Sequence, residues 1–427
     1  MHFLRVITHF HSPFSFDACD DLGIVNQIVN QNCVDDVREA VCIDHEDVVF
    51  STDHPNNMAR YPFEDLFLHR PEDEWILSPD GEKIGNRIHC PDGFTSDWYP
   101  GLEGRFIGLG MRKHSSNNQD ARIGLYNSED LKSKLEIASK TGALMIVPHT
   151  ESRSLEYLKE VNPAAIEIYN FHAYMDPRIR KKDLKLSPLG NAWVFLRYLL
   201  DPLKRLDSNY LFIELAEFSP VYFEKWDALQ AQGILATGVA GADSHQTIFK
   251  QKMSDGERLD SHRRMIRFFS NFILTEKNDE DSVKNAITRG RVYFVIEEFG
   301  TPLGMDFHVQ SDNGQKPKVI AEMGDQLKSG LGSLVFHLPT LYPSLEFKDD
   351  EASPEIWAEL IRVDATAHET VVMKSQGNSE LIYPNPIPGH YRVHVWIKPH
   401  HLKKHLYSKK LADEPFLWVV SNPIHIL

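Results

Sequence analysis

The chain has 427 residues, of which 42% are hydrophobic and 25% charged, an ordinary composition for a folded protein with a sizeable core. Its 61 Asp and Glu outnumber its 46 Lys and Arg, so the formal net charge is -15. This excess argues against nucleic acid and anionic membrane surfaces as partners, because both require a basic face. No apolar run reaches the roughly 18 residues of a membrane span. We expect a small-molecule substrate and no membrane span. The sequence does not determine the oligomeric state.

The four cysteines are too few for a disulfide scaffold and show no CxxC spacing. They are Cys19, Cys33, Cys42 and Cys90. One disulfide is possible, and free, partly buried thiols are the alternative. Two localisations are therefore compatible with the sequence: the cytoplasm, or export as a form that lacks its signal.

From its start to about residue 300 the chain alternates short apolar strands with helical segments, which is typical of a parallel α/β layer or barrel. The predicted strands are 3–7, 47–52, 144–147, 164–169, 210–215 and 234–241. The predicted helices are 127–143, 153–160, 263–274 and 281–290. We therefore predict a first domain over residues 1–300.

The pattern changes after residue 300. Short alternating runs such as "MDFHVQ", "SLVFHL" and "YRVHVWI" are separated by Gly, Pro, Asn and Asp turns. Alternation with a period of two predicts half-buried strands. We predict an all-β sandwich domain over residues 301–427, a size typical of such modules. Its histidines, which include His308, His337 and His394, lie inside strands and are not expected to bind metal.

Most predicted strands of the first domain end in side chains that can bind a metal. These are His9 and His11 with Asp17 beyond, Asp53 and His54, Glu103 and His114, His149, and Asp243 with His245. Residues i and i+2 of a strand point to the same face, so His9 and His11 project together. The carboxyl ends of parallel strands also converge in α/β folds. Their joint placement predicts a metal site.

A second DH pair, Asp44 and His45, competes with Asp53 and His54 for the same role. The segment before Asp44 resembles the end of a helix, whereas "VVFST" before Asp53 is a better strand. We therefore predict that His54 binds metal and that His45 lies on the surface.

The order HxHSxxSxD, TDH, PGxE…H, PH and GADSH resembles the polymerase and histidinol phosphatase (PHP) domain over about residues 1–250. The resemblance implies a distorted (β/α)7 barrel with two or three metal ions at the strand ends. It implies one metal on His9, His11, Glu103 and Asp243, a second on Glu103, His114 and His149, and a third on Asp17, His54 and His245. The C-terminal half resembles the sandwich of the carbaryl hydrolase-like branch.

Together these features predict a metal-dependent hydrolase that uses a metal-bridging hydroxide, acting on a phosphoester. The alternatives are a carboxyl ester, carbamate or amide hydrolase, or a non-catalytic metal-binding scaffold whose sandwich binds a partner or glycan. Imidazoles and carboxylates suit Zn, Mn or Fe equally. Asp243 or His245 is the candidate proton donor to the leaving group. Arg153 is the candidate oxyanion or phosphate contact, with a solvent-facing helix residue as the alternative.

Overall fold

The computed structural model describes residues 1–188, 194, 196–198, 200, 207–215, 217–253, 255–311, 317–342, 352–377 and 380–427. The chain divides into two compact units, each assembled from separated segments. Unit 1 comprises Met1–Thr150, Pro163–His172 and Val239–Asn285, and unit 2 comprises Glu151–Asn162, Ala173–Gly238 and Ala286–Leu427. The domain boundary at residue 300 stays a prediction. Within the described ranges, no helix is long and apolar enough to cross a membrane.

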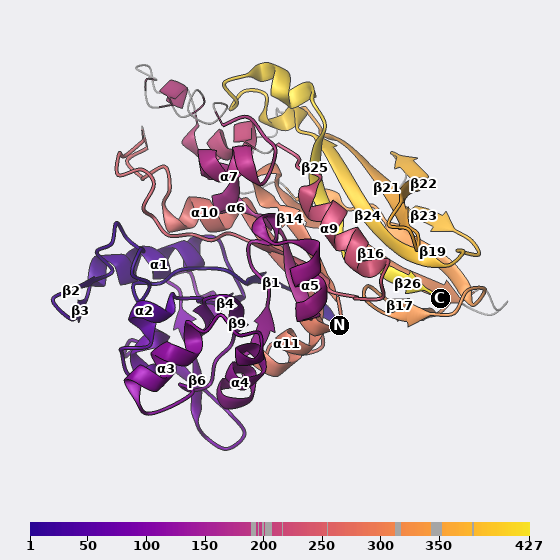
Figure 1. The fold of residues 1–427 in the computed structure, drawn as a ribbon. Helices are drawn as coiled ribbons and strands as arrows, with labels where there is room; N and C mark the ends of the chain where they lie inside the picture. The colour runs from indigo at the N-terminus through magenta and orange to yellow at the C-terminus, as the bar shows by residue number, and fades with distance from the viewer. Residues whose placement is uncertain are drawn as a thin grey trace. The chain divides into compact units, whose positions relative to one another are not determined.

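Unit 1 contains a mixed sheet in which β1 lies between β13 and β4 (Figure 1). Its strands, in spatial order, are β13 (Phe269–Thr275), β1 (His2–Ile7), β4 (Val48–Phe50), β7 (Thr95–Tyr99), β6 (Lys83–His89) and β5 (Glu74–Leu77). Strand β1 runs parallel to β4 and antiparallel to β13. Leu4, Val6 and Ile7 of β1 are buried, so the end of this strand lies in the core.

Smaller sheets extend unit 1 from the ends of these strands. They are β8 (Leu102–Glu103), β9 (Ile107–Leu109) and β10 (Leu144–Ile146), then β11 (Ala165–Asn170) with β12 (Thr237–Gly241), and β2 (Ile24–Val25) with β3 (Ile28–Val29). Parallel bridges connect Asp53 to Leu102, Val147 to Ile166, and Phe10 to Ser244. The pairings therefore run from β1 through β4, β8–β10, β11 and β12, and return to the end of β1.

Some helices of unit 1 begin or end at residues with clear capping signals. They are α1 (Gln31–Ile43), α2 (Pro55–Met58), α3 (Gln119–Tyr126), α4 (Lys132–Thr141) and α10 (His262–Phe268). The side chain of Asn30 accepts the Asn32 N–H at the start of α1. Gly142 ends α4 with a φ of 78°. Helices α1 and α10 lie side by side (Figure 1).

Two predicted elements are wrong. The predicted helix 263–274 ends at Phe268 and continues as β13, because "FSNFILT" pairs along β1 from Thr275 to Asn271. The predicted strand 210–215 is a 3₁₀ helix over Ser208–Leu215. In both cases an apolar run was compatible with helix and strand, and tertiary pairing decided between them.

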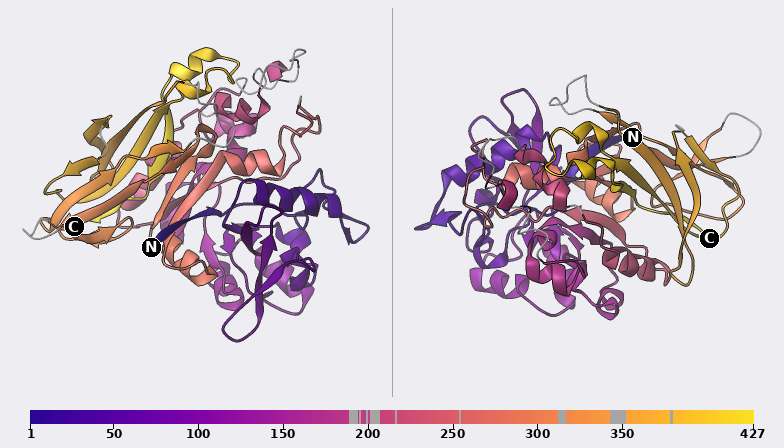
Figure 2. Two further views of the ribbon diagram at one scale, coloured as in Figure 1. Left: turned by 180° about the vertical axis from the view of Figure 1, so that it is seen from behind. Right: turned by 90° about the horizontal axis from the view of Figure 1, so that it is seen from above.

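Unit 2 is dominated by antiparallel sheets (Figure 2). One has the order β18 (Gln326–Leu327), β26 (Ile424–Ile426), β24 (Gly389–Lys398), β25 (Phe416–Ser421) and β14 (Val292–Ile296), and β21 (Glu355–Val363) joins β24 to β22 (Glu369–Gln376). A second has the order β17 (Val319–Glu322), β16 (Asp306–Ser311), β19 (Gly332–His337) and β23 (Glu380–Tyr383). Strands β15 (Thr301–Leu303) and β20 (Thr340–Tyr342) pair separately. The antiparallel strands predicted after residue 300 are therefore present.

Helices α5 (Leu155–Val161), α7 (Pro177–Lys182) and α9 (Val221–Gln230) belong to unit 2. Helices α6 (Phe171–Met175) and α11 (Glu280–Thr288) continue from the segments of one unit into those of the other.

Candidate metal centre

His9 and His11 follow β1 directly, and both side chains are fully buried. Phe10 between them contacts the rings of Trp98 and His262, at centroid distances of 5.9 and 5.0 Å. The side chains therefore alternate as in a strand, with Phe10 in the core and the two imidazoles on the other side. Their Nε2 atoms lie 3.3 Å apart, so the predicted convergence is present.

Four ligand atoms meet where His9 and His11 approach Glu103 and Asp243. Glu103 Oε2 lies 3.4 Å from His9 Nε2 and 3.3 Å from His11 Nε2. Asp243 Oδ1 lies 3.2 Å from both of these nitrogens. A tetrahedron with metal–ligand bonds of about 2.0–2.1 Å has edges of about 3.3–3.4 Å. The spacing of these atoms therefore fits one metal ion, on the ligand set that the family resemblance implied.

Asp243 provides a second test of this fit. Its Oδ1 atom is buried and makes no hydrogen bond within the part of the chain that the structure describes, although a nitrogen of His245 also lies 3.4 Å away. A buried carboxylate oxygen without a hydrogen bond is costly unless an ion satisfies it. Asp243 also has a φ of 52°, as does His149. Left-handed backbone at two non-glycine strand ends is strain of the kind found at functional sites.

A second group lies on the other side of His11. Asp17 Oδ2 is 3.2 Å from His54 Nε2 and 3.4 Å from His245 Nε2. Together with His11, these residues place one ligand atom each within 4.8 Å of one another. The side chains of Asp17 and His54 keep 28% and 23% exposure, so this group faces solvent.

A third set of contacts surrounds the other oxygen of Glu103. His149 Nε2 lies 2.8 Å from Glu103 Oε1 and 3.8 Å from Asp243 Oδ2. Glu103 thus presents Oε2 to His9 and His11 and Oε1 to His149. This two-sided arrangement is what a bridging carboxylate requires.

His114 does not join these groups. Its Nε2 lies 2.9 Å from the carbonyl oxygen of Tyr61, and its Nδ1 lies 3.5 Å from the Tyr126 hydroxyl. Burial lowers its pKa to about 4. The family resemblance implied a ligand set of Glu103, His114 and His149. In the structure Glu103 and His149 are in contact, whereas both nitrogens of His114 face other polar groups.

The imidazoles are held so that Nδ1 is occupied and Nε2 faces the centre. His9 Nδ1 donates to Glu167 Oε1 at 2.6 Å, and His11 Nδ1 to Ser15 Oγ at 2.9 Å. The Nδ1 atoms of His54 and His245 donate to the carbonyl oxygens of Glu103 and Asp243, at 3.1 and 3.0 Å. A hydrogen bond at one ring nitrogen fixes the tautomer and leaves the other nitrogen free for a metal.

Sequence reasoning missed Glu167, because it lies within the apolar run of β11 and has no motif around it. Its side chain is fully buried. Besides His9, it accepts the backbone N–H of His149 through Oε2 at 2.8 Å. Asn170, at the end of the same strand, donates to Glu167 Oε2 at 3.1 Å and to Asp243 Oδ2 at 3.2 Å. Strand β11 therefore supplies the residues that orient the ligands.

Asp53 positions the loop after His11 rather than an imidazole. Its two oxygens accept the backbone N–H of Ser12 at 2.6 Å and the Ser12 hydroxyl at 2.7 Å. The Ser15 hydroxyl donates to Asp17 Oδ1 at 3.0 Å while it accepts from His11. Of the two serines of the HxHSxxSxD motif, Ser15 thus links the candidate ligands His11 and Asp17, and Ser12 fixes the loop between them to Asp53.

The ionisable side chains of the centre shift one another's pKa values. Burial raises the pKa values of Glu103 and Asp243, but the surrounding imidazoles, His9 above all, outweigh it and hold both well below the ordinary range. Burial and His245 lower the pKa of His11 to about 4. Asp17 and Glu103 outweigh burial and raise the pKa of His54 to about 9. Both buried carboxylates therefore stay ionised, as ligands for a cation must.

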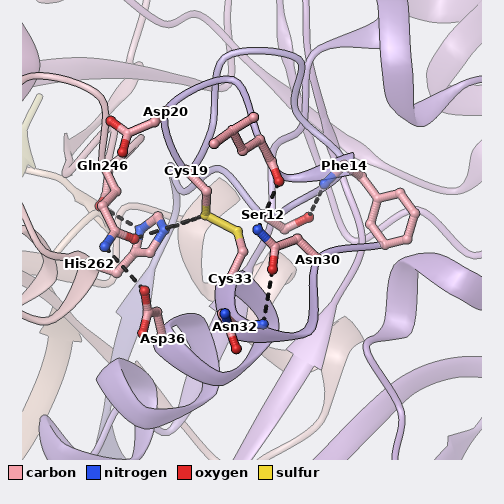
Figure 3. Close-up of a disulfide and its surroundings, with 12 residues drawn as sticks. Ser12, Phe14, Cys19, Asp20, Asn30, Asn32, Cys33, Asp36, Gln246 and His262 are labelled. Atoms are coloured by element: carbon pink, nitrogen blue, oxygen red, sulfur yellow. Dashed lines mark hydrogen bonds between the residues drawn. A yellow bond between two sulfur atoms is a disulfide. The ribbon is translucent and has the colours of Figure 1, made fainter. Parts of the chain in front are cut away.

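Two disulfides are present, Cys19–Cys33 and Cys42–Cys90, which corrects the expectation of one bridge or free thiols. The first disulfide connects the loop that contains Asp17 to α1, beside Gln246 and His262 (Figure 3). Cys19 follows Asp17 by two residues, and its backbone N–H donates to the carbonyl oxygen of His245 at 2.8 Å. Cys19 and the two aspartates that follow it all have positive φ, so the crosslink holds a strained turn.

Removing each disulfide separately distinguishes its local role from its global one. Replacing Cys19 and Cys33 by Ala should lower the free energy of unfolding by about 3 kcal/mol, since their separation is 14 residues. It should also weaken metal binding about tenfold, because Asp17 loses its anchor. The matched change at Cys42 and Cys90 should lower stability and leave metal affinity unchanged. Denaturant unfolding and zinc titration test this, and equal metal affinity in both variants would contradict it.

The choice between the two DH pairs can be tested directly. His54 lies in the second group, whereas the half-exposed His45 contacts Asp92 Oδ2 at 2.5 Å. His54→Ala should therefore lower metal affinity at least tenfold, as loss of a ligand exceeds the loss of an orienting group. His45→Ala should change stability by no more than about 0.5 kcal/mol. Metal content after dialysis is the measurement, and the opposite ranking would show that the second motif is misplaced.

Arg153 belongs to unit 2, whereas every candidate ligand belongs to unit 1. Its guanidinium carbon lies 5.4 Å from the centroid of the Tyr157 ring. Its role toward a substrate stays a prediction.

No family model matches the sequence, and no curated protein matches it. PsfC from Pseudomonas syringae PB-5123 is similar in structure, with a TM-score of 0.36 and 13% identity over 69% of this chain and 92% of that chain. So is a two-domain protein containing a predicted PHP-like metal-dependent phosphoesterase from Bacteroides vulgatus ATCC 8482. Its TM-score is 0.32, with 11% identity over 92% of this chain and 90% of that chain.

Proposed function

We propose that the protein is a metal-dependent hydrolase of the PHP type. The observation that carries this proposal is the convergence of four Nε2 atoms, each on an imidazole whose Nδ1 is already engaged, around the carboxylates of Asp17, Glu103 and Asp243. A purely structural cluster of buried histidines has no need for so many Nε2 atoms gathered around the same carboxylates. The ligands suit two or three divalent ions, with Zn, Mn and Fe as candidates.

Divalent ions bound here would supply Lewis acidity and a water of lowered pKa. Glu103, with one oxygen toward His9 and His11 and the other toward His149, would be a ligand on both sides. Glu167 and Ser15 would keep His9 and His11 in the tautomer that binds metal. His245 would hold the proton for the leaving group, because Asp243 stays ionised, and the exposed edges of Asp17, His54 and His149 would admit the substrate.

The circuit of strand pairings in unit 1 supports a closed, barrel-like arrangement. The bridges at Asp53–Leu102, Val147–Ile166 and Phe10–Ser244 lie just past the strands, where the ligands are found. We propose that this is the distorted (β/α)7 barrel of a domain over residues 1–300. The antiparallel sheets after residue 300 would then form the sandwich domain.

A phosphoester is the substrate class we favour, with Arg153 neutralising the phosphoryl group. A carboxyl ester, carbamate or amide is the alternative, because such a neutral substrate requires no additional cation. Arg112 is a poorer phosphate ligand than Arg153, since its guanidinium is already paired with Glu280 at 2.9 Å and with Asp281.

The test is to strip the full-length protein of metal, reload it with zinc, manganese or iron, and assay a chromogenic phosphodiester and an arylester together. We expect metal-dependent phosphodiester cleavage. Charge-assisted hydrogen bonds contribute about 1.5–3 kcal/mol, so Arg153→Ala should lower catalytic efficiency on the phosphodiester roughly ten- to a hundredfold. Arg178→Ala is the control, because that side chain is 90% exposed.

Three outcomes separate the alternatives. Arylester turnover without phosphodiester cleavage would establish the alternative substrate class. Metal uptake without turnover of either substrate would favour a binding scaffold with a partner- or glycan-binding sandwich. The absence of any metal uptake would overturn the proposal itself.

The two disulfides support an oxidising compartment, because such crosslinks persist outside the reducing cytosol. We therefore favour an exported form of the protein over a cytoplasmic one.

A further inference from the structure

The four-stranded sheet β17–β16–β19–β23 of unit 2 has an apolar face and a second face, called the polar face here, on which several polar side chains lie. Phe307 and Val309 of β16 are buried on the apolar face, where Phe307 lies 6.3 Å from the ring of Phe336. Side chains alternate along a strand, so Asp306 and His308 must lie on the opposite face. The same face also carries Val335, which is directly opposite His308 and 1% exposed, so the polar side chains lie beside a buried apolar one.

The strand register gathers further polar side chains beside these two. Asp306 is directly opposite His337 on β19, and His308 is opposite Glu322 on β17. His337 is in turn opposite Glu380 on β23. Directly opposite residues share a face, so two imidazoles and three carboxylates collect on the polar side of four adjacent strands.

We propose that Asp306, His308 and His337 form a second site for a divalent transition-metal ion, separate from the centre in unit 1. Each residue offers one ligand atom, and these atoms lie within 4.8 Å of one another. The imidazole centroids of His308 and His337 are 5.9 Å apart. This proposal differs from the expectation in the sequence analysis that no histidine after residue 300 binds metal, because it assigns His308 and His337 as ligands.

The surroundings favour a cation. His308 is 5% exposed, and its Nδ1 lies 3.0 Å from Asp306 Oδ2. The carboxylates of Glu322 and Glu380 also act on His308 electrostatically. Three carboxylates beside two imidazoles leave an excess of negative charge that a divalent ion would neutralise. These strands pair in register over several residues, so the backbone holds the ligands in place without the ion.

The donor set defines the class of metal. Two imidazoles with a carboxylate suit zinc and its neighbours, whereas calcium and magnesium prefer oxygen ligands alone. Only three side chains are assigned, so a fourth position remains for water or for Glu322 or Glu380. An ordinary Asp306–His308 ion pair is the alternative, and it requires no role for His337.

The test is equilibrium dialysis of metal-stripped, full-length protein against zinc. His337→Ala and Asp306→Asn should each remove one equivalent of zinc from the total, or weaken it about a hundredfold or more, since a ligand matters more than the groups that orient it. Hydrolytic activity and the remaining equivalents should be unchanged. His368→Ala, an exposed histidine of the same unit, is the matched control and should bind as the parent does.

His337 and Asp306 are used because they are more exposed than His308, so their replacement disturbs folding less. A second measurement is the thermal midpoint, which zinc should raise by a smaller amount in both variants than in the parent. Unchanged zinc stoichiometry and an unchanged thermal response in both variants would overturn the proposal. This result would leave the hydrolytic centre of unit 1 untouched, because that centre shares none of these residues.

Discussion

Replacing Glu103 by Gln is expected to remove metal from the centre and to lower turnover by about a thousandfold or more. Glu103 contacts His9 and His11 through Oε2, at 3.4 and 3.3 Å, and His149 through Oε1, at 2.8 Å. An amide offers one weak oxygen ligand and no negative charge, so two ions can no longer share it. Metal catalysis contributes several kcal/mol, and every 1.36 kcal/mol corresponds to a factor of ten in rate.

The experiment compares metal content and turnover of Glu103→Gln with those of Glu136→Gln. Glu136 is an exposed residue of the same unit whose carboxylate pairs with Lys140 one helical turn away. The control should retain full metal content and activity. If Glu103→Gln kept both, the two-sided role assigned to this carboxylate would be wrong.

Replacing Glu167 by Gln is expected to weaken metal binding by about ten- to a hundredfold without removing any ligand. The two oxygens of Glu167 accept from His9 Nδ1 and from the His149 backbone N–H. A glutamine has one oxygen and one NH2 group, so either orientation of its amide leaves one of these donors facing another donor. His9 also loses the charge that makes its other nitrogen a better ligand.

Gly241 provides an independent check of the same contact. A Cβ atom at this position would lie 2.1 Å from Glu167 Oε1 and 3.2 Å from the Cβ of His9. Gly241→Ala should therefore displace the carboxylate and weaken metal binding as Glu167→Gln does. Zinc titration of both variants beside the Glu136→Gln control measures this. Parent-like affinity in Glu167→Gln would show that His9 is oriented by other groups.

Local sequence was sufficient for residues whose role follows from position along one strand. The spacing of His9 and His11 predicts a common face, and the burial of Phe10 between them agrees. The same reasoning placed His54, His149, Asp243 and His245 near one another, because each directly follows a buried strand or its extension. This succeeds because strand alternation and the convergence of strand ends are properties of the backbone.

Tertiary structure alone decided the contacts that join distant segments. Glu167 lies 158 residues from His9 in sequence, and nothing in "AIEIYN" distinguishes it from an incidental polar residue in a strand. His114 has a ligand's spacing from Glu103, yet its Nε2 faces the Tyr61 carbonyl 53 residues away. Likewise, the cysteine pairing and the change from α10 to β13 depend on which segments meet in space. Periodicity determines which way a side chain points, whereas packing determines what it meets there.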